Sequence, residues 1–230
     1  MHTIPRPSAG LIPLAVLALL SSGCYNPIEG EEDLVILLPA PVLDLTPPQD
    51  GSLRTAVLAG GCFWGVEAVF EHVRGVVEVV SGYSGGTEEE AVYDLVLTGH
   101  TDHAESVRIL YDPAQVSYGQ LLMVFFSVAH DPTQLDHQGP DWGPQYRSNV
   151  FYEHQDQLDV VRAYLDQIEA DGLFPKEIVT RLDPLEAFYL AEEDHQDFVA
   201  RYPEEPYVVF IDLPKIENLR RFYPELFERP

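Results

Sequence analysis

Cys62 is the residue of this chain best placed to act as a nucleophile. Residues 60–65 read Gly-Gly-Cys-Phe-Trp-Gly and follow an apolar segment, 55–59, that is typical of a buried strand. Apolar residues then recur at helical spacing through residues 66–73, and Gly75 is placed to end the helix. Backbone N–H groups and the dipole at a helix N-terminus favour a thiolate, the reactive form of cysteine. The spacing predicts a reactive cysteine on a strand-to-helix turn, and it fits a buried structural cysteine equally well.

Four histidines offer a second kind of chemistry. His100 and His103 have the spacing H-x-x-H, and His130 and His137 follow further along the chain. Histidines with such spacing are common zinc ligands. The pattern predicts no helix that would carry the first pair, so we expect hydrogen bonding within the fold from His103 and no bound metal.

The elements that must position these residues alternate irregularly between strand-like and helix-like patterns. Residues 117–120 form a capping box at the start of one predicted helix, and a long Pro- and Gly-rich loop covers 132–144. A mixture without strict alternation favours a two-layer α+β sandwich with a mixed sheet. Strands are predicted at 55–59, 76–80, 92–97, 106–111, 148–152 and 177–182, and helices at 63–73, 117–128, 155–170, 186–200 and 216–222.

The first part of the chain reads as an export and tethering segment. Residues 1–24 are typical of a signal peptide, with a short apolar stretch that ends in Ser-Ser-Gly and then Cys24. That ending resembles a bacterial lipobox, so we expect Cys24 to carry a lipid anchor; an ordinary cleaved signal is the alternative. Residues 25–52 hold six acidic and no basic side chains and predict an extended, solvated tether, except that the apolar run 34–38 is expected to lie against the domain. Residues 53–230 then form the folded domain of an exported, periplasmic or cell-envelope protein.

The charge of the chain restricts its partners. Its 230 residues carry a formal net charge of −25, with 13 basic side chains against 38 acidic ones. Binding nucleic acid requires clustered Lys and Arg that neutralise phosphates. Nucleic acid is therefore excluded as a partner, and we expect the protein to be a monomer.

The segment around Cys62 resembles the signature of the type A peptide methionine sulfoxide reductases, which reduce the S epimer of methionine sulfoxide. Further segments resemble that family and come in the same order over about residues 54–220. The resemblance implies a ferredoxin-like plait with an irregular C-terminal wrap, and it makes residues 53–230 the catalytic domain. The further segments are Gly82-Tyr83-Ser84-Gly85-Gly86, His103-Ala104-Glu105, Tyr111-Asp112-Pro113, His130-Asp131-Pro132-Thr133, Gln145-Tyr146-Arg147-Ser148, Ala191-Glu192 and His195-Gln196.

The resemblance also implies roles for particular residues. Cys62 is the nucleophile that attacks sulfur, and Glu105 is the general acid that delivers a proton to the departing oxygen. Burial of Glu105 is expected to raise its pKa and keep it protonated at neutral pH. The hydroxyls of Tyr93 and Tyr146 are expected to hydrogen-bond the sulfoxide oxygen, with Tyr93 read as part of a strand.

Three further residues complete the expected pocket. Phe63 and Trp64 are expected to hold the S-methyl group, and Asp141 helps to organise the pocket from the long loop. Such a pocket selects one epimer because the oxygen must meet the polar groups while the methyl group meets the rings.

The two cysteines of the sequence predict how the enzyme is recycled. Attack on the sulfoxide leaves Cys62 as a sulfenic acid, which condenses with a thiol. Many relatives carry recycling cysteines near the C-terminus, but residues 197–230 contain none. We expect no bound cofactor and a thioredoxin-like protein or other external thiol as reductant, with oxidised proteins and free methionine sulfoxide as substrates.

Two other classes of function compete with this interpretation. A Cys-His hydrolase would use Cys62 activated by His103, His130 or His195. A non-enzymatic acidic lipoprotein would hold Cys62 buried and inert.

Overall fold

The computed structural model describes residues 35–229. The predicted signal peptide with Cys24, and residues 25–34 of the predicted tether, lie outside this range.

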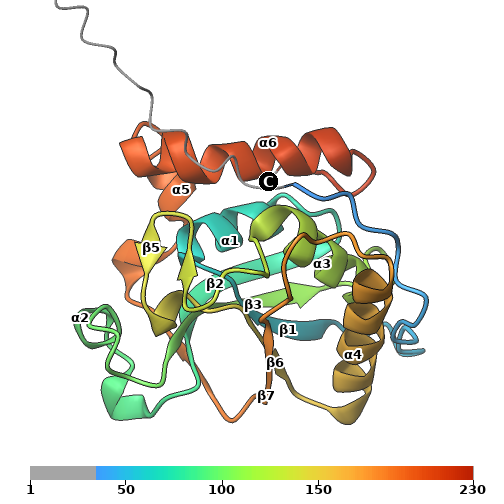
Figure 1. Ribbon diagram of the computed structural model, residues 1–230, viewed down its shortest axis with the longest axis horizontal. Coiled ribbons are helices and arrows are strands. Elements are labelled where there is room, and N and C mark those ends of the chain that lie inside the picture. The colour runs from blue at the N-terminus through green and yellow to red at the C-terminus, as the bar shows by residue number, and fades with distance from the viewer. Residues whose placement is uncertain (1–34, 230) are drawn as a thin grey trace, which may run out of the picture. The chain divides into compact units, whose positions relative to one another are not determined.

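A mixed six-stranded sheet forms the centre of the domain (Figure 1). Its strand order is β7-β6-β1-β3-β2-β8, in which β6 and β7 are parallel and the other neighbours are antiparallel. Strand β1 is apolar on both faces, and most of β3 is buried, because both faces of the sheet are covered there by other parts of the chain. The strands are β1 Arg54–Ala59, β2 Val76–Ser84, β3 Ala104–Tyr111, β6 Asn149–Tyr152, β7 Arg181–Pro184 and β8 Phe188–Leu190.

Helices cover one face of this sheet and enclose the main core. Helices α1 (Phe63–Glu71), α3 (Tyr118–Val124) and α4 (Gln155–Ala170) pack their apolar faces toward the strands. The chain continues from α3 into a π-helical turn, Phe125–Ala129. The predicted capping box is confirmed, because Ser117 and Gln120 bond each other's backbone N–H groups at the start of α3.

The C-terminal part of the chain returns across α1. It contains the short helix α5 (Phe198–Arg201), a π-helical turn at Val208–Asp212 and α6 (Leu213–Phe222). Figure 1 shows α6 lying over α1, on the side of α1 that faces away from the sheet. The structure thus confirms an α+β fold with a mixed sheet, as expected. In the part of the chain that the structure describes, no helix is both long enough and apolar enough to span a bilayer.

Several predicted elements differ from the observed ones. Residues 92–97, predicted as a strand, contain the short helix α2 (Tyr93–Val96), in which Val96 is buried and Leu95 is exposed. The predicted helix 186–200 is divided into β8, a 3₁₀ turn and α5, because β8 completes the sheet by pairing with β2. β7 begins at Arg181, within the segment 177–182 that the prediction placed in a strand.

Two turns and one loop were also predicted imperfectly. Helix α1 ends at Glu71, and Gly75, with φ +85°, lies in the turn that follows. Strand β2 extends beyond the predicted segment 76–80, through Gly82 to Ser84. The long loop contains a small hairpin of β4 (His137–Gln138) and β5 (Asp141–Trp142).

The segment from residue 35 to residue 52 makes specific contacts with the domain. The Leu38 side chain is buried, and its N–H donates to the hydroxyl of Tyr223 at 3.1 Å. Asp44 accepts a hydrogen bond from the Gly119 N–H at 2.9 Å, in the first turn of α3. Leu38, in the apolar run, therefore lies against the domain as expected, whereas Asp44 contacts the domain from a part of the segment that was predicted to be a solvated tether.

Candidate active site

Cys62 occupies the N-cap position of α1, where the backbone turns from β1 into the helix. The preceding Gly61 has φ +93°, and a Cβ at this position would come within 2.6 Å of the Gln138 side chain. A Cβ at Gly60 would likewise come within 2.8 Å of the His130 ring. Both glycines are therefore needed to bring the turn this close to its neighbours. The Cys62 side chain is 8% exposed and is a free thiol.

The protonation state of Cys62 differs from the expectation. Burial raises its pKa well above the ordinary value, and the carboxylates of Glu105, Asp212 and Asp141 act in the same direction. The N–H of Trp64 in the first turn of the helix lowers the pKa, but this effect is the smaller one. In the free protein the thiol is favoured over the expected thiolate, because desolvation outweighs the helix N-terminus.

Glu105 lies on β3 directly beside the cysteine. Its carboxyl accepts a hydrogen bond from the Phe63 N–H at 3.0 Å and is hydrogen-bonded to the Cys62 thiol. The residue is 2% exposed, and burial raises its pKa to about 8. At neutral pH the site therefore holds a neutral carboxylic acid next to a neutral thiol, as expected for Glu105.

The structure brings the three remaining polar residues of the prediction to the same place. Burial is the main reason that the pKa of Tyr93 rises to about 12, and the charges of Glu105 and Cys62 contribute to that rise. The pKa of Tyr146 is raised by the same causes in the same order, with Asp141 next. Tyr93 begins helix α2 instead of lying on a strand, and Tyr146 ends a 3₁₀ turn. Both hydroxyls stay protonated, so both can donate a hydrogen bond.

Aromatic rings form the apolar side of the site. The Trp64 ring stacks on Phe198 of α5 with 3.6 Å between ring centroids. Its indole N–H donates to Nδ1 of His195 at 3.2 Å. Phe63 is buried, with its ring 5.8 Å from Tyr83 and 5.5 Å from His195. The rings are thus fixed by the C-terminal wrap as well as by α1.

The carboxylates of Glu192 and Asp141 each accept hydrogen bonds from tyrosines. The contact between Asp141 and Tyr207 was not anticipated from the sequence. Glu192 accepts from the Tyr83 hydroxyl at 2.8 Å and from the Tyr93 N–H at 2.8 Å. It belongs to the segment Ala191-Glu192 that resembled the family, so a signal for it existed. Tyr207 donates its hydroxyl proton to Asp141 and packs edge-on against Trp64 with 6.0 Å between ring centroids. No motif pointed to Tyr207, which is far from Asp141 in sequence.

A buried ion pair lies behind the first turn of α1. Lys215 Nζ is 3.9 Å from Asp212 Oδ1, and both side chains are almost completely buried. A Cβ at Gly65 would come within 2.2 Å of the Asp212 carboxylate. Gly65 therefore allows the C-terminal wrap to approach the helix that carries Cys62.

The histidines are engaged in hydrogen bonds within the fold. Nε2 of His103 bonds the Thr87 carbonyl at 2.8 Å, and its Nδ1 faces the Gly86 N–H. His130 bonds the Phe125 carbonyl at 2.9 Å, and burial lowers its pKa to about 4. Within residues 35–229, no group of three or more His, Cys, Asp or Glu is arranged to hold a metal ion. The bonds of His103 and His130, together with the Trp64–His195 bond, give a Cys-His hydrolase no activated base.

The chain matches one family model and many curated proteins. A model described as peptide methionine sulfoxide reductase matches residues 54–225. Peptide methionine sulfoxide reductase MsrA 2 of Mesorhizobium japonicum is 54% identical over 178 residues, which cover 77% of this chain and 91% of that protein. The MsrA 2 of Synechocystis sp. is 53% identical over 191 residues, 82% of this chain and 89% of that protein.

Solved structures agree with these relatives. Methionine sulfoxide reductase A of Corynebacterium diphtheriae is 33% identical with a TM-score of 0.57, over 76% of this chain and 91% of that one. Mxr1 from Saccharomyces cerevisiae in its reduced form is 30% identical with a TM-score of 0.60, over 69% of this chain and 90% of that one. The chain belongs to the peptide methionine sulfoxide reductase A family and is an oxidoreductase that reduces methionine sulfoxide.

Proposed function

We propose that the enzyme reduces the S epimer of methionine sulfoxide, free or within a protein, by direct attack of Cys62 on sulfur. The observation that carries this proposal is the contact between the Cys62 thiol and a buried Glu105 carboxyl whose pKa is raised to about 8. A nucleophile and a proton donor thus stand side by side, both buried, in the proposed substrate pocket. Tyr93, Tyr146 and Asp141 supply the polar wall of that pocket, and Phe63 with Trp64 supplies the apolar wall.

The first half-reaction balances without any cofactor. The cysteine sulfur bonds to the sulfoxide sulfur, and the sulfur–oxygen bond of the protonated substrate breaks with loss of water. A water molecule then attacks the Cys62 sulfur, the sulfur–sulfur bond breaks with its electrons on the substrate sulfur, and the products are methionine and Cys62 sulfenic acid. The sulfoxide is reduced by two electrons, and the cysteine is oxidised by two. Glu105 donates a proton to the substrate oxygen as negative charge develops there, and the Tyr93 and Tyr146 hydroxyls donate hydrogen bonds to the same oxygen. The raised pKa of the free thiol means that Cys62 gives up its proton only as the substrate is activated.

The second half-reaction requires a thiol from outside the folded domain. An external thiol condenses with the sulfenic acid to give a mixed disulfide and water, and a further thiol then releases Cys62 and a disulfide. We propose a thioredoxin-like protein as this reductant. Cys62 is the free cysteine of the described residues, and Cys24 lies outside them.

Epimer specificity tests the proposed attack. Each epimer of a methionine sulfoxide peptide is incubated with the protein and dithiothreitol, and methionine is measured by chromatography. We expect methionine from the S epimer, none above background from the R epimer, and none from either epimer in Cys62→Ser. Equal turnover of the two epimers would contradict the proposal.

A count of methionine released without reductant tests the recycling step. In a full-length Cys24→Ser protein, we expect about one methionine per enzyme and a Cys62 that reacts with a sulfenic acid probe. Added thioredoxin restores turnover. The matched protein that keeps an unmodified Cys24 shows by mass spectrometry whether that thiol closes a disulfide with Cys62; such a disulfide in the protein isolated from cells would overturn the external-thiol model.

We further propose that the enzyme is exported and anchored to a membrane of the cell envelope through a lipid on Cys24. The lipobox-like ending of residues 1–24 supports this, and so does the acidic segment that follows it. Mass spectrometry of the mature N-terminus tests the proposal. An unmodified Cys24, or an N-terminus at another residue, would contradict it.

A further inference from the structure

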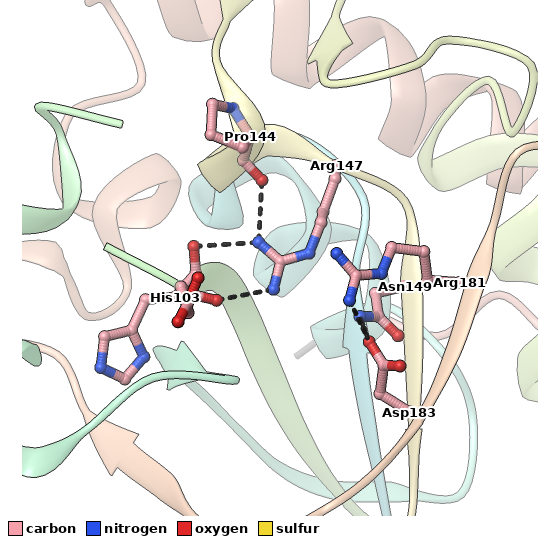
Figure 2. A network of polar contacts seen from close by, with 7 residues as sticks. His103, Pro144, Arg147, Asn149, Arg181 and Asp183 are labelled. Atoms are coloured by element: carbon pink, nitrogen blue, oxygen red, sulfur yellow. Dashed lines mark hydrogen bonds and ion pairs between the residues drawn. The ribbon is translucent and has the colours of Figure 1, made fainter. Parts of the chain in front are cut away.

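Arg147 is a buried arginine whose hydrogen-bond partners are backbone carbonyls. The residue is 5% exposed. Nη2 donates to the Asp102 carbonyl at 2.8 Å, and Nη1 donates to the carbonyls of His103 at 3.1 Å and Pro144 at 2.9 Å. Figure 2 shows the guanidinium reaching between these two stretches of chain.

The two stretches lead directly to two residues of the proposed site. Arg147 follows Tyr146 in the chain, and Pro144 opens the 3₁₀ turn that carries Tyr146. On the other side, Asp102 and His103 immediately precede β3, whose second residue is Glu105. The guanidinium therefore joins the backbone just before Glu105 to the backbone on both sides of Tyr146.

The surroundings of the guanidinium are built to allow this bridge. Gly85 has φ +103°, and a Cβ at this position would lie 2.8 Å from the Asp102 carbonyl oxygen and 2.9 Å from Arg147 Nη2. The His103 ring is itself held by Gly86 and Thr87. An arginine suits this place because its planar fork points several donors in fixed directions, whereas a lysine offers one flexible ammonium group.

We propose that Arg147 is a positioning residue that sets the Tyr146 hydroxyl relative to the Glu105 carboxyl. This inference rests on the roles proposed above for Tyr146 and Glu105. Both groups must meet one sulfoxide oxygen, and a displacement of about 1 Å in a reacting geometry lowers rates on the order of 10²-fold. A purely structural arginine would stabilise the fold without affecting that geometry.

Arg147→Lys tests the inference, with Arg181→Lys as its matched control. Arg181 lies close by on β7, is largely exposed, and pairs with Asp183 at 3.2 Å (Figure 2). We expect Arg147→Lys to slow single-turnover methionine formation at saturating substrate by about 10- to 100-fold with little change in KM. Arg181→Lys is expected to match the wild-type enzyme.

Double variants separate positioning from stability. If Arg147 acts by placing the Tyr146 hydroxyl, then Arg147→Lys should lower the single-turnover rate only slightly in a Tyr146→Phe background, because the hydroxyl that Arg147 places is absent. In a Trp64→Phe background, which alters the apolar wall, Arg147→Lys should lower the rate by the same factor as in the wild-type enzyme. The inference would be overturned if Arg147→Lys lowered the rate by the same factor in both backgrounds, or if Arg147→Lys alone had the wild-type rate.

Two measurements keep the result decisive. Thermal unfolding establishes that each variant is folded at the assay temperature. If Arg147→Lys does not fold, Gly85→Ala displaces the same contact from the opposite side and is tested in the same two backgrounds with the same expected pattern. Wild-type rates for Tyr146→Phe and Glu105→Gln would instead show that the proposed roles of these residues are wrong.

Discussion

Two buried glutamates lie at helix α1, and their comparison separates catalysis from burial. Glu105 sits at the N-terminus of the helix and is 2% exposed, while Glu67 lies one turn further along the helix and is 1% exposed. Burial raises the pKa of each carboxyl to about 8. By protonation state alone the two residues are equally good general acids.

Their neighbours are different. The Glu105 carboxyl is hydrogen-bonded to the Cys62 thiol, and its charge raises the pKa of both Tyr93 and Tyr146. Glu67 accepts a hydrogen bond from the Ser81 N–H at 3.2 Å, and after burial the charge of Glu71 contributes most to its raised pKa. A raised carboxyl pKa therefore marks a buried acid, and in the proposed mechanism only the carboxyl next to the nucleophile serves as an acid catalyst.

The largest expected effect is on the rate of the first half-reaction. We expect Glu105→Gln to slow single-turnover methionine formation by about 10²- to 10⁴-fold, since it removes a general acid. Glu67→Gln is its matched control and should stay within about twofold of wild type, because Glu67 contacts no reacting group. Rapid-quench kinetics with an S-sulfoxide peptide measures both. Comparable losses in the two variants would remove the distinction drawn between them.

Accessibility of the thiol is the control for this experiment. Cys62 should remain open to alkylation in both variants, which shows that the nucleophile is intact. A Glu105→Gln protein that can no longer be alkylated would point to a displaced cysteine instead of a missing proton.

The pH dependence of the same rate should show the second effect. In the proposed mechanism Glu105 acts in its protonated form, so the rate should be level below a pH of about 8 and fall about tenfold per pH unit above it. This fall in rate at high pH, the alkaline limb of the profile, should persist in Glu67→Gln and disappear in Glu105→Gln. Rates for all three proteins between pH 6 and about pH 10 test this; a limb that survives in Glu105→Gln would assign it to another group.

The sequence predicted much of the frame that holds Glu105. The bounds of α4, Gln155–Ala170, were predicted correctly because its apolar spacing is regular over four turns. Residues 92–97 were misassigned because β-branched and apolar side chains there suggested a strand, while no neighbouring strand pairs with them. Elements whose form depends on distant partners, such as β8, cannot be recognised from local spacing.

The same reasoning explains which site residues were found. Cys62 and Glu105 stand in short motifs, whereas Tyr207 reaches Asp141 only through the fold. The burial of Glu67 also had no local signal. Its carboxyl accepts from the Ser81 N–H of β2, and Gln196 of the C-terminal wrap accepts from the same N–H, so this burial depends on parts of the chain that are distant in sequence.

The smallest expected effect, on stability, should be shared by the two glutamates. Each folded-state pKa of about 8 exceeds the ordinary value of 4.5. Between these values the unfolded chain releases a proton that the folded protein retains, so stability falls as the pH rises from 4.5 toward 8, and the penalty is complete above 8. Glu67→Gln removes this penalty while its amide oxygen can still accept from Ser81. We therefore expect a gain in unfolding free energy on the order of 1 to 3 kcal/mol at pH 8.5, and a much smaller gain at pH 5.

Urea unfolding at the two pH values measures this gain, and Glu105→Gln should show the same sign. The pair would then agree in stability and differ in catalysis, which is the pattern expected when burial sets the pKa of both carboxyls and contact with Cys62 sets the function of one. If the gain in unfolding free energy caused by Glu67→Gln is no larger at pH 8.5 than at pH 5, then Glu67 is ionised in the folded protein at both pH values. Glu105 would then be the one neutral acid at this helix, and the difference between the two residues would lie in their protonation as well as in their neighbours.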